Sequence, residues 1–178
     1  MTHVSIIPYH PRYQPDFKRL NIAWIEKYFQ VEPHDLEQLD QPQTFILPNK
    51  GQIFFAVADG EVVGCVAMVN TGTAPVPALA ALAGNRGTPE RVRPDGGCTG
   101  FELAKMAVSP TMQGQGIGKK LCLAALDYAR QLGASTVWLE SNRILTPALT
   151  LYEQVGFREV PRVETPYARA NIRMEITL

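Results

Sequence analysis

The chain has 178 residues, of which 46% are hydrophobic, and this length and composition suit one globular domain with a substantial core. Lysine plus arginine and aspartate plus glutamate number 17 each, so the formal net charge is zero. This balance excludes the strongly basic surface typical of proteins that bind nucleic acids or anionic membranes.

Cysteine and histidine usage argues against a disulfide framework and against a metal site. The three cysteines lie far apart, and the three histidines fall in the first fifth of the chain without metal-ligand spacing. The N-terminus has no basic segment followed by a long apolar one, and no stretch is long enough to cross a bilayer. We expect a cytoplasmic protein with no metal, no nucleic-acid partner and no membrane partner.

The first 70 residues alternate between strand-like and helix-like patterns. Residues 3–9 are rich in strand formers, and apolar side chains then recur at helical spacing over 17–29. A short helix is predicted over 33–39. Residues 51–69 read as two strands joined at Asp59-Gly60, which is a strong hairpin signal.

Residues 71–100 differ in composition from the rest of the chain. They carry much of its proline and glycine and show no sustained periodicity. We expect a long Pro/Gly/Ala-rich insertion. It could cover a binding site, form a contact between subunits or lack order, and its composition does not decide among these roles.

The second half of the chain again alternates strands and helices. Strands are predicted over 100–108, 135–141, 156–160 and 171–178, and helices over 118–132 and 146–155. Taken together, the elements predict a single domain of mixed α+β class. Its central, mixed, twisted sheet would have about seven strands, with about four helices on both faces.

A glycine-rich segment, "QGQGIG" at 113–118, joins a predicted strand to a predicted helix. Gly114, Gly116 and Gly118 allow a tight turn and the close approach of a ligand, and the N–H groups at a helix start attract phosphate. The spacing is not a Rossmann fingerprint, because Lys119 stands where a third glycine is needed. It is not a Walker loop either, because Lys120 stands where Ser or Thr is needed.

The segment does fit the pattern Gln/Arg-x-x-Gly-x-Gly/Ala, and "TLYEQVGFREV" follows at 150–160. In the strand and glycine loop that begin at residue 101 and in this second segment, which together span residues 101–160, the chain resembles the GNAT superfamily of N-acetyltransferases. "ELAKMAV", "ESN" and the final "PYARANIRME" are similar to acetyltransferase domains that stand alone or are fused behind MarR-type regulators. The resemblance implies a single N-acetyltransferase domain over 1–178 that uses acetyl-CoA as cosubstrate.

The resemblance also implies how the cofactor is held. The glycine loop would bind the pyrophosphate, the preceding strand would pair with pantetheine, and a backbone N–H near residues 106–108 would receive the thioester oxygen. The family asparagine usually lies where this chain has Leu145, so Asn142 is open to a second interpretation as a turn-forming residue. The implied cofactor-binding residues are Met106, Ala107, Val108, Gln113, Gly114, Gln115, Gly116, Ile117, Gly118, Lys119 and Asn142.

Two residues match the catalytic positions of the family. Glu102 would act as general base through water, and Tyr152 would act as general acid toward the CoA thiolate. Strict alternation would place Glu102, Ala104, Met106 and Val108 on one strand face, with apolar neighbours that raise the pKa of Glu102. The alternative interpretations are a solvated glutamate at a strand end and a core tyrosine with its hydroxyl satisfied.

The acceptor site is implied only by the family. In this fold the connection between the first two helices and the loop between the last two strands line the acceptor pocket. Here Tyr28, Phe29, Tyr167 and Arg169 would frame an amine that bears a carboxylate, with Arg169 pairing with that carboxylate. Packed aromatics and a solvated arginine are the alternative.

The resemblance leaves the acceptor and the assembly open. The acceptor is a small-molecule amine or a protein amine, and many family members are homodimers. The alternative function is a non-catalytic acyl-CoA-binding sensor or partner module.

Overall fold

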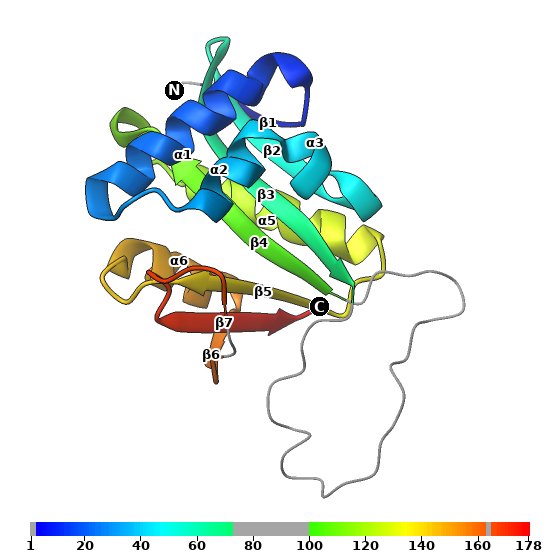
Figure 1. Ribbon diagram of the computed structural model, residues 1–178. Coiled ribbons are helices and arrows are strands. Elements are labelled where there is room, and N and C mark those ends of the chain that lie inside the picture. Colours follow the sequence, from blue (N-terminus) through cyan, green and yellow to red (C-terminus); the bar gives the residue numbers. More distant parts are fainter. Residues whose placement is uncertain (1–2, 73–99, 163–164) are drawn as a thin grey trace, which may run out of the picture.

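The computed structural model describes residues 3–72, 100–162 and 165–178, and within them seven strands form one sheet (Figure 1). The strand order is β1-β2-β3-β4-β5-β7-β6, and every neighbouring pair is antiparallel except β4 and β5. This confirms the predicted mixed sheet. The strands are β1 (Val4–Pro8), β2 (Gln52–Ala58), β3 (Glu61–Gly72), β4 (Gly100–Val108), β5 (Thr136–Ser141), β6 (Arg158–Val160) and β7 (Ile172–Thr177).

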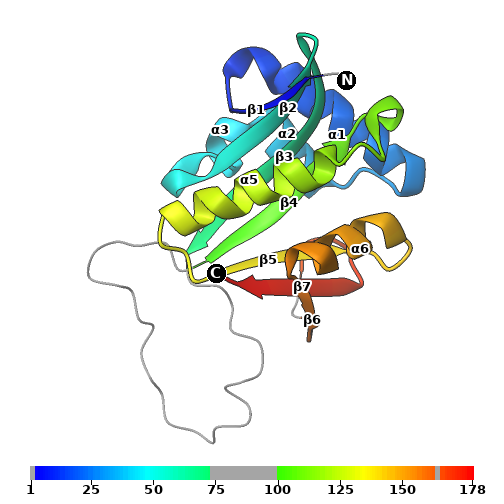
Figure 2. The same cartoon turned by 180° about the vertical axis from the view of Figure 1, so that it is seen from behind.

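Helices cover both faces of the sheet, as Figures 1 and 2 show from opposite sides. One face carries α1 (Gln14–Tyr28), α2 (Pro33–Asp40) and α3 (Pro42–Phe45), and the other carries α5 (Ile117–Gln131) and α6 (Thr146–Val155). Among the α-helices of the described ranges, only the four-residue α3 is not predicted from the sequence. None of these helices is long and apolar enough to span a bilayer.

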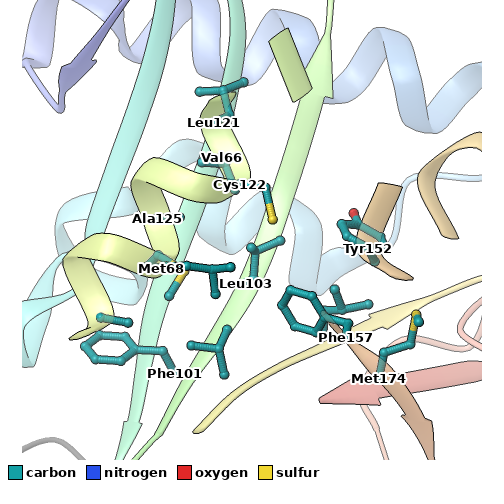
Figure 3. Packing of buried hydrophobic residues seen from close by; sticks show 14 of the residues in the cluster. Val66, Met68, Phe101, Leu103, Leu121, Cys122, Ala125, Tyr152, Phe157 and Met174 are labelled. Carbon is teal, nitrogen blue, oxygen red and sulfur yellow. The ribbon is translucent and has the colours of Figure 1, made fainter. Parts of the chain in front are cut away.

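The sheet is buried on both faces because each helix layer packs its own core against it. On the α5 and α6 side, Phe101 and Leu103 of β4 pack with Leu121, Tyr152 and Phe157 (Figure 3). On the α1 to α3 side, the core is centred on residues that include Phe17, Leu39 and Phe55, which are fully buried.

Strand β4 is irregular at Lys105, where the backbone has a φ of +51° and the register with β3 shifts. Such a β-bulge adds one residue and exchanges the faces of the residues beyond it. The predicted strict alternation is therefore wrong: Met106 and Val108 pack with Leu103 toward α5 and α6, and not on the face of Glu102.

Strands β4 and β5 pair over only three residues each, from Gly100 to Glu102 and from Thr136 to Trp138. Beyond Glu102 the two strands diverge (Figure 1). The insertion predicted over 71–100 lies outside the described residues apart from its two ends, which belong to β3 and β4.

Candidate active site

A cavity of about 120 Å³ opens where β4 and β5 diverge. Its wall combines side chains from both faces of the sheet, including Glu102 of β4 and Tyr152 of α6. The predicted residues that also line it are Phe29, Met106, Asn142, Tyr167 and Arg169. Tyr28 and residues 113–119 of the glycine loop do not line it.

Glu102 is 92% buried. The pKa of its carboxyl is raised to about 7, because burial and the nearby Glu140 together outweigh the opposing charges of Lys105 and Arg173. The carboxyl lies on the cavity wall, and in the described part of the chain no side chain forms an ion pair with it. The direction of this shift agrees with the prediction, although Met106 and Val108 do not lie on the face of Glu102 and so are not its cause. Near neutral pH the group can both lose and accept a proton.

Tyr152 lies on α6 with its ring against Phe157, at a centroid distance of 5.8 Å (Figure 3). Burial raises the pKa of its hydroxyl, and the nearby Cys122 adds to the rise. The hydroxyl therefore stays protonated at neutral pH and can donate a hydrogen bond. The ring belongs to the core and the residue also lines the cavity, so the two interpretations of this tyrosine are compatible.

The glycine loop begins α5 with two residues in the left-handed region. Gly114 and Gly116 both have a φ of +76°, and a Cβ on either would meet nothing within 4 Å. The first N–H groups of α5 have no partner within the helix, and its first turn has no acidic side chain. Open space beside an electropositive helix start fits an anionic group such as a pyrophosphate.

A glycine is needed at position 118 for a different reason, which is helix packing. A Cβ there would lie 3.2 Å from Cδ2 of Leu151, so this glycine lets α5 pack closely on α6. Gln113 ties the loop to the end of β4, because its Nε2 donates to the Val108 carbonyl at 3.1 Å. The three glycines of the loop therefore have two different roles: Gly114 and Gly116 form the turn, and Gly118 allows the close packing of α5 on α6.

Asn142 forms a turn at the end of β5. Its Oδ1 accepts from the Ile144 N–H at 3.0 Å, and its Nδ2 donates to the Arg169 carbonyl at 2.6 Å. Both ends of the amide are therefore engaged within the protein. This geometry favours the turn-forming interpretation over a cofactor contact.

Four charged side chains form an ion cluster beside the cavity: Asp35 and Lys105, which are buried, and Glu32 and Arg169, which are partly buried. Asp35 is fully buried, and its two oxygens accept from Arg169 at 2.7 Å each. Lys105 donates to Asp35 at 2.9 Å, and Arg169 also donates to Glu32 at 2.9 Å. Burial alone would raise the pKa of Asp35, but hydrogen bonding to Arg169 and the charge of Lys105 lower it to about 2.

The ion cluster bears on the expectation that Arg169 pairs with a carboxylate of the acceptor. The guanidinium of Arg169 is already occupied by two carboxylates of the protein, so it is poorly placed to hold a carboxylate of a substrate. Tyr167 donates to Gln38 at 3.2 Å and accepts from Lys105 at 3.1 Å. Tyr28 is 45% exposed and lies outside the cavity wall.

Sequence reasoning missed several residues of this site. Glu140 lines the cavity together with Glu102. The signal for it is strand alternation within 135–141, which places Glu140 on the same face as Trp138. Trp138 is the residue of β5 that pairs with Glu102. Asp35 is separated from Arg169 by 134 residues. No local pattern connects them.

Comparisons with known proteins relate this chain to a known family and fold. The model of the acetyltransferase (GNAT) family matches residues 17–157. The chain is similar to the uncharacterized N-acetyltransferase YjgM of Escherichia coli, with 41% identity over 59 residues. That match covers 33% of this chain and 35% of YjgM, so the chain aligns with about a third of this relative.

Solved structures share the fold at low sequence identity. A GNAT-family acetyltransferase from Staphylococcus aureus Mu50 has a TM-score of 0.77 at 16% identity, covering 98% of this chain and 99% of that one. The protein yncA from Salmonella typhimurium, solved with acetyl-CoA as its cofactor, has a TM-score of 0.64 at 15% identity. That match covers 98% of this chain and 94% of yncA.

Proposed function

This chain belongs to the acetyltransferase (GNAT) family, and from that premise we propose that it transfers the acetyl group of acetyl-CoA to the nitrogen of a primary amine. The observation that carries the proposal is a single cavity lined by both Glu102 and Tyr152. One of these groups can accept a proton at neutral pH, and the other can donate one.

Acetyl-CoA supplies an activated acyl group, and this chain offers two surfaces that fit it. The open start of α5 at Gly114 and Gly116 suits the pyrophosphate. Beyond Glu102, β4 is no longer paired with β5, so its free edge can take an extended pantetheine arm as an added strand. The acetyl-CoA found with the yncA fold relative supports this assignment.

Glu102 prepares the acceptor amine. An aliphatic amine is protonated at neutral pH and must lose a proton before it can attack a thioester. Glu102 takes that proton, through a water molecule, and its raised pKa makes it a stronger base than an exposed glutamate. A backbone N–H near Met106 stabilises the charge that develops on the thioester oxygen.

Tyr152 completes the transfer. As the C–N bond forms and the C–S bond breaks, the nitrogen releases its second proton to water and the hydroxyl of Tyr152 donates a proton to the departing sulfur. Solvent then returns a proton to the tyrosine and takes the proton held by Glu102. Both proton transfers then occur within one cavity, which suits direct transfer in a ternary complex. A cytoplasmic location, a homodimeric state and a single domain over 1–178 stay predictions.

Thermal unfolding with and without acetyl-CoA tests the cofactor, with NADH and ATP as controls that also carry phosphates. Acetyl-CoA at about a hundred times its Kd should stabilise the fold by about 2.7 kcal/mol, a Tm rise of several degrees. Mass spectrometry of amines incubated with enzyme and acetyl-CoA tests transfer. Binding without transfer to any amine would favour the sensor function, and the absence of binding would overturn the proposal.

A further inference from the structure

Within residues 3–72, 100–162 and 165–178, the three cationic side chains at or near the cavity are each paired with a carboxylate of the protein. Lys105 and Arg169 belong to the ion cluster. Arg173 is buried and donates from Nε and Nη2 to Glu175 at 3.1 and 3.0 Å. Each of these positive charges is therefore compensated before any ligand enters.

Two carboxylates on the cavity wall have no such partner. In the described part of the chain, neither Glu102 nor Glu140 forms an ion pair, and Glu140 accepts a hydrogen bond only from the hydroxyl of Thr165. Both side chains line the cavity. The cavity consequently has an excess of negative charge that a cation would compensate.

The remainder of the cavity wall is largely apolar. Trp24 and Ile25 of α1 line it together with Phe29, which directly follows α1, and the ring centroids of Trp24 and Phe29 are 6.0 Å apart. Leu145 and Ala148 line it from the start of α6. An aromatic or other apolar group fits this wall, and the aromatic faces also favour a nearby ammonium.

We propose that the acetyl acceptor is a primary ammonium carried on an aromatic or apolar body, with no carboxylate beside the amine, and that Glu140 binds this ammonium before Glu102 removes its proton. The inference rests on the proposed function and names its substrate class. An amino acid would bring its carboxylate toward Glu102 and Glu140, and such like-charge contact is unfavourable. Arg169 cannot relieve the repulsion while Asp35 and Glu32 occupy its guanidinium.

Three matched amines test the role of charge. Phenethylamine, phenylalanine and phenylalaninamide share one aromatic body, and phenylalanine alone carries a carboxylate. We expect kcat/KM for phenethylamine and for phenylalaninamide to exceed that for phenylalanine by about tenfold or more. If phenylalaninamide is rejected as strongly as phenylalanine, bulk rather than charge is selected and the inference is overturned.

The variant Glu140→Gln tests the assigned residue. Its KM for phenethylamine should rise about tenfold with kcat nearly unchanged. The ratio of kcat/KM for phenethylamine to kcat/KM for phenylalanine should therefore fall. The control variant Glu61→Gln makes the same chemical change at an exposed position in the β2–β3 hairpin and should behave as the wild type. Equal discrimination in Glu140→Gln and the wild type would overturn the assignment.

Direct calorimetric titration of the three amines separates this inference from the proposed function. If acetyl-CoA fails to bind, the proposed function fails, while preferential binding of phenethylamine would still support the acidic cavity. If acetyl-CoA binds and the protein takes up phenylalanine as well as phenethylamine, or binds neither, the inference fails and the cofactor assignment stands. Acetylation of a peptide N-terminus in preference to phenethylamine would also overturn it.

Discussion

The carboxyl of Glu102 has a pKa of about 7 because burial opposes its charged form. A glutamate exposed at a strand end would already be charged near pH 5 and would be a weak base. The position matches a family motif, but its environment depends on α1 and β5, which the local sequence does not reveal. Sequence therefore predicted the residue, and the fold determines its chemistry.

Catalysis by Glu102 should appear in the pH dependence of the reaction. In the wild type, kcat/KM should rise with pH and level off above an apparent pKa of about 7, because only the carboxylate accepts the proton. Glu102→Gln should lower kcat by about 10²-fold to 10⁴-fold and remove this limb of the profile. Steady-state kinetics between pH 5.5 and 9 measure both, and an unchanged profile in the variant would exclude Glu102 as base.

Stability provides the control for this variant. The folded-state pKa of Glu102 is raised above its ordinary value, so the stability it contributes is present below about pH 4.5 and is lost as pH rises through about 7. Glu102→Gln should therefore have a higher Tm than the wild type at pH 8 and nearly the same Tm at pH 4.5. A Tm that falls at both pH values would mean that the variant damages packing.

Among the elements, the turn into α5 places the most restrictive demand on residue type. Gly116 is the N-cap of α5 and occupies the left-handed region, where an L side chain is strained by about 1–2 kcal/mol. The glycine pattern predicted this turn from sequence. It could not predict that Gly118 serves the packing of α5 on α6, because Leu151 is distant in the sequence.

Gly116→Ala should separate backbone strain from cofactor binding. We expect a loss of about 1 kcal/mol in the free energy of unfolding, together with weaker binding of acetyl-CoA. Gly60→Ala is the matched control, since Gly60 also has a positive φ, of +86°, and open space around it, but lies in the β2–β3 turn. Urea unfolding and calorimetric titration measure the two effects, and equal loss of binding in both variants would contradict the assignment of the loop.

Sequence reasoning succeeded for elements whose ends carry a local signal. The start of α6 was predicted because Pro147 lies in its first turn. Gly156, which was expected to begin a strand over 156–160, has a φ of +111° and instead ends α6, and β6 begins at Arg158. The bulge in β4 was missed because the residue with positive φ is a lysine, which gives no such signal. Helix α3 was missed because one helical turn has too few residues to show a period.

At the scale of the molecule, the sheet has two parts that meet at the short β4–β5 pairing. The ion cluster reinforces this junction, because Asp35 of α2 binds both Lys105 of β4 and Arg169 of the β6–β7 connection. Its members come from three separate parts of the chain. The cluster is therefore a property of the assembled fold and of no single element.

Asp35→Asn should destabilise the protein by about 3–5 kcal/mol at pH 7, because it leaves Lys105 and Arg169 buried without their shared carboxylate. The folded-state pKa of Asp35 is lowered, so its contribution is present above about pH 4 and is lost as pH falls toward 2. The difference between variant and wild type should therefore shrink at pH 3. Urea unfolding at both pH values measures it.

Asp40→Asn is the matched control for this prediction. Asp40 pairs with Lys18 at the surface, where both side chains are more than 40% exposed, so its loss should cost less than about 1 kcal/mol. Similar losses in Asp35→Asn and Asp40→Asn would mean that the ion cluster does not hold the two parts of the sheet together.

The strand order also bears on how copies of this chain could aggregate. The two outermost strands expose unpaired backbone groups, which in other proteins can recruit a strand from a neighbouring molecule. Here one edge, β1, is short and ends at Pro8, and the other, β6, has three residues, of which Arg158 and Glu159 are exposed charges. Short length, proline and charge each oppose intermolecular strand addition, so the fold carries its own protection against fibrous assembly.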